Sequence, residues 1–148
     1  MTTRTWKWTL MVCRLLLGGV FIYASLDKIA HPAAFADILY NYQLIPAWMI
    51  HPLAVWLPWL ELLAGIFLIA GVFAQGAALL LGGLLLVFVA ALGINLLRGL
   101  SIDCGCFTTT AGTHTGGMIE LIVRDLLLLI PALLIIRRGL PRVGQRGE

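Results

Sequence analysis

Charged residues are scarce in this sequence. Only 11% of its 148 residues are Asp, Glu, Lys or Arg, whereas 61% are hydrophobic, and the mean hydropathy is +1.00. A water-soluble domain of this length needs more charge to cover its surface, so the composition favours an integral membrane protein. The net charge of +3 comes mainly from the two ends of the chain. That distribution indicates membrane topology and argues against a nucleic-acid partner.

Four apolar runs are long enough to cross a bilayer core, which takes about 20 helical residues. They cover residues 8–29, 53–73, 77–97 and 118–136. None alternates with the period of two that a barrel strand shows, and leucine dominates, so each run is expected to be a helix. The first run contains Arg14 and ends without a small-residue cleavage site, so we expect a permanent span and not a signal peptide. The sequence therefore predicts one all-α domain over residues 1–138, a bundle of four transmembrane helices.

Basic residues are missing from two segments between these runs. Residues 31–51 and 99–117 contain no Lys or Arg, whereas basic residues precede the first run and follow the last. The positive-inside rule then places both termini in the cytoplasm and the two segments outside. We expect a multi-pass protein of the bacterial inner (plasma) membrane, with residues 139–148 as a basic cytoplasmic tail and residues 99–117 on the periplasmic side.

The first outer segment has an amphipathic pattern. Phe35, Ile38, Leu39 and Tyr42 recur at helical spacing, which predicts a short helix lying on the outer surface. A simple cap over the bundle and a docking surface for a partner are both compatible with this pattern.

Polar residues gather toward the outer end of every predicted span. Ionisable groups within a membrane cost several kcal/mol each, so they normally face the bundle interior and pair. We therefore expect a polar cluster that supports a site, with Arg98 or Arg124 as the partner of Glu61. The alternative is snorkelling to the interface, which suits Lys28 and Arg98 best. The residues concerned are Asp27, Lys28, Glu61, Asn95, Arg98, Glu120, Arg124 and Asp125.

The second outer segment carries two cysteines separated by one residue. Cys104 and Cys106 can close a small, strained disulfide ring, and Gly105 supplies the backbone freedom that closure needs. Strain favours an exchangeable bond over a structural one, and the outer side of a bacterial membrane permits disulfides. Asp103 could accept a proton from the pair, while Arg98 or Arg124 could favour the thiolate. These two thiols are the candidate catalytic residues.

A metal site is the main alternative for the same thiols. Two thiolates with His114, completed by His31 or His51, would suit copper or zinc. The third interpretation is that Cys104 and Cys106 are simply unreactive thiols. Cys13 lies alone near the opposite end of the first run, where a small apolar residue is the expected role.

The ordered polar motifs resemble the MauE branch of the DoxX-like membrane proteins, from about Arg14 to Arg138. The matching segments are Arg14-Leu15-Leu16-Leu17-Gly18 with Phe21, Asp27-Lys28-Ile29, Tyr42-Gln43-Leu44-Ile45-Pro46, Leu57-Pro58-Trp59-Leu60-Glu61-Leu62 with Gly65, Asn95-Leu96-Leu97-Arg98-Gly99, Asp103-Cys104-Gly105-Cys106-Phe107 and Arg124-Asp125. The resemblance implies a four-helix membrane bundle and a role in methylamine utilisation. It further implies help in forming or transferring disulfides in periplasmic methylamine dehydrogenase, alongside a thioredoxin-like partner.

The sequence has one cysteine pair on the expected outer side of the membrane, so a partner must supply the second pair for exchange. Cys104 and Cys106 are expected to exchange with a periplasmic thioredoxin-like protein that brings the second pair, and a methylamine dehydrogenase subunit is a candidate client. A membrane quinone is a candidate acceptor that could reset the pair, although no motif requires it. The alternative function is a metal-binding or purely assembly-supporting membrane protein.

Overall fold

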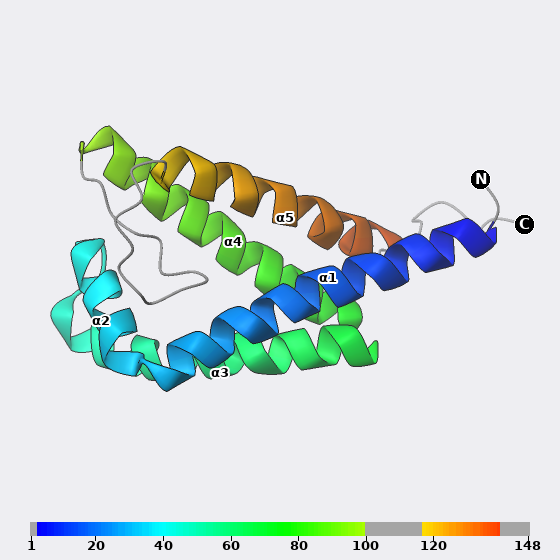
Figure 1. The fold of residues 1–148 in the computed structure, drawn as a ribbon, viewed down its shortest axis with the longest axis horizontal. Helices are drawn as coiled ribbons and strands as arrows, with labels where there is room; N and C mark the ends of the chain where they lie inside the picture. Colours follow the sequence, from blue (N-terminus) through cyan, green and yellow to red (C-terminus); the bar gives the residue numbers. More distant parts are fainter. Residues whose placement is uncertain (1–2, 100–116, 140–148) are drawn as a thin grey trace, which may run out of the picture.

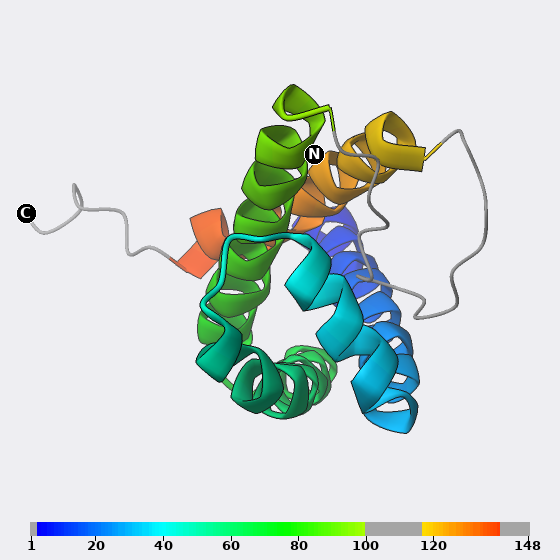
Figure 2. The same ribbon diagram turned by 90° about the vertical axis from the view of Figure 1, so that its left-hand side faces the viewer.

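The computed structural model describes residues 3–99 and 117–139, and every regular element within these ranges is a helix. The described residues form four long helices and one short helix. The long helices lie side by side, and the short one covers the end of the bundle where the first long helix ends (Figures 1 and 2). The helices are α1 (Thr3–Ala30), α2 (Pro32–Asn41), α3 (Ala47–Ala70), α4 (Ala74–Leu97) and α5 (Gly117–Gly139).

Three helices have the length and apolarity to cross a membrane. They cover Arg4–Ala30, Ala47–Ala70 and Ala74–Leu97, which supports the predicted membrane character. The long helix α5 runs beside α4 but carries Arg124, Asp125 and Arg137. A fourth span stays a prediction, as does the cytoplasmic location of the termini. The first residues of α1 and the last residues of α5 lie at the same end of the bundle (Figure 1).

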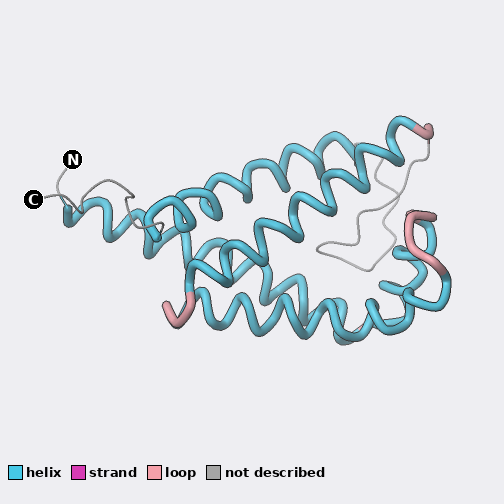
Figure 3. Tube along the Cα trace, turned by 180° about the vertical axis from the view of Figure 1, so that it is seen from behind, coloured by secondary structure: helices cyan, strands magenta, loops and turns pink. Residues whose placement is uncertain are grey.

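The helix α3 begins six residues before the predicted start at residue 53 and includes Pro52 and Pro58. Prolines are tolerated in membrane helices because neighbouring groups satisfy the freed backbone atoms. The helix ends where Gly71 adopts a left-handed conformation, with φ +77°, which a glycine adopts without a steric cost. A short turn then leads into α4, so α3 and α4 form an antiparallel hairpin (Figure 3). The earlier start leaves Glu61 nearer the middle of its helix than predicted.

Two glycines let α1 and α3 approach closely. A Cβ atom placed on Gly18 would lie 2.9 Å from the Gly65 carbonyl oxygen and 2.6 Å from Ile69 Cγ1. A Cβ atom on Gly65 would lie 2.9 Å from Ile22 Cγ1. Small residues at such crossings are typical of membrane helices, because van der Waals contact replaces the hydrophobic effect as the force that associates them. This contact fixes how the remaining residues of α1 meet α3.

The short helix α2 confirms the predicted amphipathic helix. Phe35 and Leu39 are buried on its inner side and pack with Ile50 and Ala54 of α3. Tyr42, directly after the helix, is also buried and packs with Phe88 and Leu92 of α4. This placement is the one expected of a cap that covers one end of the bundle.

Candidate functional site

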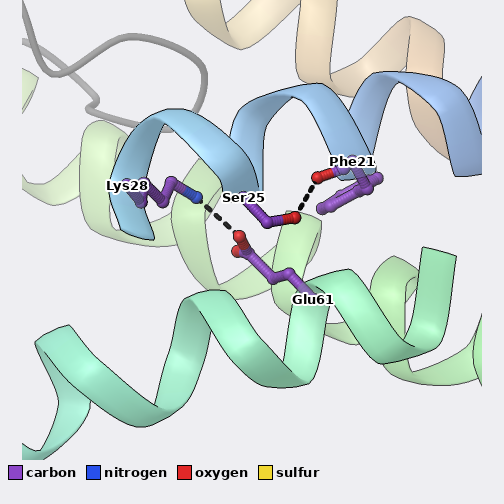
Figure 4. Close-up of polar contacts among 4 residues, drawn as sticks. All are labelled: Phe21, Ser25, Lys28 and Glu61. Carbon is purple, nitrogen blue, oxygen red and sulfur yellow. Dashed lines mark hydrogen bonds and ion pairs between the residues drawn. The ribbon is translucent and has the colours of Figure 1, made fainter. Parts of the chain in front are cut away.

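A buried ion pair joins α1 to α3. Lys28 Nζ donates a hydrogen bond to Glu61 Oε2 at 2.7 Å, and the two side chains are 1% and 0% exposed (Figure 4). A buried basic partner for Glu61 was predicted, but the choice of Arg98 or Arg124 was wrong. The snorkelling alternative is also wrong for Lys28, because this side chain points into the bundle.

Local packing explains why Lys28 faces inward. Leu17, Phe21 and Ala24 of α1 are buried and precede Lys28 at spacings of four, three and four residues, so all four share one helix face. One turn before Lys28, the Ser25 hydroxyl donates to the Phe21 carbonyl oxygen within the helix (Figure 4). The Gly18–Gly65 contact holds this face against α3, one turn from Glu61.

Two aromatic rings enclose the ammonium group of Lys28. Its Nζ lies 5.1 Å from the ring centroid of Phe35 in α2 and 5.5 Å from that of Phe88 in α4. Both distances are within the range of cation–π attraction, which strengthens when water is excluded. Four helices, α1 to α4, therefore surround this cation, and neither ring was predicted as part of the site.

Asp125 and Asn95 bring α5 and the end of α4 into the same region. Asp125 is 0% exposed, and its Oδ1 lies 3.3 Å from an Arg124 guanidinium nitrogen. Lys28 and Asp125 also interact electrostatically. Asn95 is 0% exposed and lies two turns beyond Phe88 on the same side of α4, about 10 Å further along the axis. Each long helix thus places a buried polar side chain in this half of the bundle. We call Lys28, Glu61, Asn95 and Asp125 the polar centre.

The polar centre has unused hydrogen-bonding capacity. Within residues 3–99 and 117–139, Glu61 Oε1, Asp125 Oδ2 and both amide atoms of Asn95 are buried and have no hydrogen-bond partner. Buried polar atoms are rarely left unpaired, because desolvation without a hydrogen bond costs about 1–3 kcal/mol each. The centre therefore offers acceptor oxygens and one amide donor to a bound group.

The other predicted site residues are more exposed or lie outside the described ranges. Asp27 is partly buried beside His31, with 3.7 Å between Oδ1 and Nδ1. Arg98 follows α4 and is exposed, while the Arg124 side chain is 38% exposed. The structure does not describe Asp103, Cys104, Gly105, Cys106 or His114, nor the side chain of Glu120.

The described residues contain no cluster of three or more His, Cys, Asp or Glu side chains that could hold a metal ion. His31 and His51, the two described histidines of the metal alternative, are exposed. The remaining members of that alternative, Cys104, Cys106 and His114, lie outside these ranges. Cys13 packs against the apolar core between α1 and the neighbouring helices, as expected of a small apolar residue.

Sequence reasoning missed the Lys28–Glu61 pair, although a signal for it was present. The spacing of Leu17, Phe21 and Ala24 places Lys28 on the apolar face of α1, which indicates a buried lysine. A lysine on that face needs an acidic partner within the bundle. Glu61 is the acidic residue of the helix that packs closely against α1.

Comparisons with known proteins show the family of this chain. The family model described as methylamine utilisation protein MauE matches residues 6–137. A methylamine utilization protein MauE from Paracoccus denitrificans is 36% identical over 133 residues, which cover 89% of this chain and 70% of the relative. The protein of that name from Methylorubrum extorquens is 44% identical over 85 residues, covering 57% of this chain and 46% of the relative.

A third such protein, from Methylophilus methylotrophus, is 31% identical over 113 residues, covering 76% of this chain and 60% of the relative. The chain thus spans between about half and 70% of the length of these curated relatives. No solved structure matches the chain. Because the family model covers most of the sequence, this chain belongs to the MauE family of methylamine utilisation proteins.

Proposed function

We propose that this protein is a thiol–disulfide exchange component of the bacterial inner membrane that acts in methylamine utilisation through Cys104 and Cys106. The polar centre is the observation that carries the proposal. The segment with both cysteines joins Gly99 to Gly117, at the end of the bundle where Lys28 also lies. Ionisable residues buried in a membrane bundle mark functional sites by default, since their burial is costly. The pair belongs to a segment that begins and ends beside this charged region, at Gly99 and Gly117.

The proposed reaction is a balanced exchange between two dithiol–disulfide pairs. A thiolate of one pair attacks a sulfur of the disulfide in the other, which forms a mixed disulfide and releases one thiolate. The second thiol of the attacking pair then resolves the mixed disulfide, so two electrons and two protons change sides. Because this chain carries one outward pair, a periplasmic thioredoxin-like protein is the proposed partner. A subunit of methylamine dehydrogenase is the proposed client.

A membrane quinone fits the chemistry of the polar centre. A quinone accepts two electrons and two protons, which is the change needed to restore a disulfide from two thiols. The Asn95 amide, which has no partner among the described residues, and the Lys28 ammonium group are donors suited to its carbonyl oxygens. These two residues would hold the ring, while Glu61 keeps the ammonium group in place.

The membrane arrangement that goes with this function has α5 as a fourth span and both chain ends in the cytoplasm. The absence of Lys and Arg from residues 31–51 and 99–117 supports it, as does the common end at which α1 begins and α5 ends. The cysteine pair would then face the oxidising periplasm, where a disulfide persists.

Trapping a mixed disulfide tests the proposal. In Cys104→Ser or Cys106→Ser, this chain has no second outward thiol to resolve the mixed disulfide that the remaining cysteine forms. One of the two variants should therefore accumulate a covalent complex with a thioredoxin-like protein. Both variants should lose exchange activity, whereas the control Cys13→Ser should keep it, because Cys13 packs in the apolar core. Full exchange by the double serine variant would contradict the proposal. Stoichiometric copper or zinc that is lost on His114→Ala would support the metal-binding alternative instead.

A further inference from the structure

We propose that the opposite end of the bundle holds the headgroup of an anionic phospholipid, with Arg14 as its central ligand. This site lies where α1 begins and α5 ends, far from the polar centre, and it does not depend on the proposed function. We call Arg4, Lys7, Arg14 and Arg137 the basic end.

Arg14 lies against the turn between α3 and α4. Its Nη1 atom is 3.3 Å from the position of a Cβ atom placed on Gly71, the glycine that ends α3. Its Nε atom is buried and has no hydrogen-bond partner within the described ranges. The guanidinium group therefore lies beside the turn and has a donor that no described residue satisfies. A planar guanidinium suits the two oxygens of a phosphate group.

Lys7 extends the same face of α1. Lys7, Leu10, Arg14 and Leu17 follow one another at spacings of three and four residues, and both leucines pack on the apolar core. Lys7 is nevertheless exposed, since α1 continues past the α3–α4 turn (Figure 1). This extension places an ammonium group two turns beyond Arg14 and leaves it free of the bundle.

No carboxylate of the described residues lies at the basic end to balance its cations. Arg4 and Arg137 add two exposed cations, and Arg137 directly follows Ile136, which packs on the same core as Leu10. Among the described side chains of the helices that meet here, the nearest carboxylate along the chain is Glu61. It lies nine residues before the end of α3 and is bound to Lys28. An occupant that carries negative charge would therefore be attracted by all four cations.

The surrounding surface identifies the occupant as a lipid. Beside Arg14, the side chains of Met11, Val12, Leu15 and Leu16 are 53%, 49%, 47% and 58% exposed, as expected of a face in contact with acyl chains. Trp8, which is 61% exposed, lies on the stretch of α1 that also carries Lys7. Tryptophan and basic residues together mark the depth at which acyl chains give way to headgroups. A lipid phosphate reaches Arg14 at this depth while its acyl chains follow the apolar face.

Lipid retention measured by native mass spectrometry tests the proposal. The full chain, purified in a neutral detergent, is mixed with phosphatidylglycerol or phosphatidylcholine. Wild type should retain phosphatidylglycerol in preference and melt at a higher temperature with it. Arg14→Gln should retain about fivefold less phosphatidylglycerol, and Lys7→Gln should fall between the two. The matched control is Arg98→Gln, which removes an exposed cation at the other end of the bundle and should behave like wild type.

Equal retention of the two lipids by wild type would overturn the proposal, as would undiminished retention by Arg14→Gln. Should Arg14→Gln fail to fold, Lys7→Gln decides by the same criterion. A third arm replaces the lipid by inorganic phosphate or glycerol phosphate. Stabilisation equal to that by phosphatidylglycerol would assign the site to a soluble anion and would also overturn the proposal.

Discussion

Breaking the Lys28–Glu61 pair should be one of the most damaging single changes available in this protein. Glu61→Gln keeps the size of the side chain but removes the charge that balances Lys28, whose side chain is 1% exposed. Removal of one partner of a buried ion pair costs about 3–5 kcal/mol, because the other charge stays buried without compensation. Lys28→Met should cost a similar amount, since it leaves the Glu61 carboxylate uncompensated.

The double variant Lys28→Met/Glu61→Leu distinguishes the net contribution of the ion pair from the cost of leaving one charge buried without its partner. Replacing both charges by apolar side chains removes the uncompensated charge, so the double variant should recover most of the stability that each single variant loses. The measurement is reversible denaturation by SDS in mixed micelles, followed by circular dichroism. Arg98→Gln is the control and should change the free energy of unfolding by less than about 0.5 kcal/mol, because Arg98 is exposed. A Glu61→Gln variant as stable as wild type would contradict this expectation, as would losses of Lys28→Met and Glu61→Leu, measured singly, that simply add in the double variant.

Three further predictions follow from the packing and the topology. Gly18→Ala should lower the free energy of unfolding by about 1–3 kcal/mol, because the new Cβ atom would lie 2.6 Å from Ile69 Cγ1, whereas Gly83→Ala, with open space around it, should be neutral. In a background without native cysteines, His114→Cys should react with a membrane-impermeant thiol reagent from outside, and labelling only after permeabilisation would reverse the orientation. Gly105→Val should slow disulfide exchange by stiffening the ring, and an unchanged rate would show that closure does not need glycine there.

Much of the fold could be predicted from the sequence because the membrane restricts the choice of structure. Long apolar runs can only become helices in lipid, and α1, α3, α4 and α5 lie close to the four predicted runs. The largest error is the start of α3, six residues earlier than predicted. Pro52, which directly precedes the predicted start, lies within the helix, because a proline is tolerated inside a membrane helix.

The candidate site was only partly predictable, since its geometry depends on how two distant helices meet. Glu61 was correctly expected to find a buried basic partner, but Lys28, 33 residues earlier, is brought to it by the close approach of α1 and α3 at Gly18 and Gly65. Periodicity shows which face of each helix is buried, but it does not show the register between them. The cysteine pair stays a prediction from the sequence and the family.

A redox titration of Cys104 and Cys106 in native membranes tests the central claim most directly. Membranes are equilibrated with defined ratios of oxidised and reduced dithiothreitol and glutathione, free thiols are alkylated with a reagent that adds mass, and the chain is resolved by electrophoresis. Both thiols should become reactive together in one two-electron transition, at a potential of about −270 to −120 mV, the range of exchanging disulfides. Two thiols that stay fully alkylated at every potential in this range would contradict it.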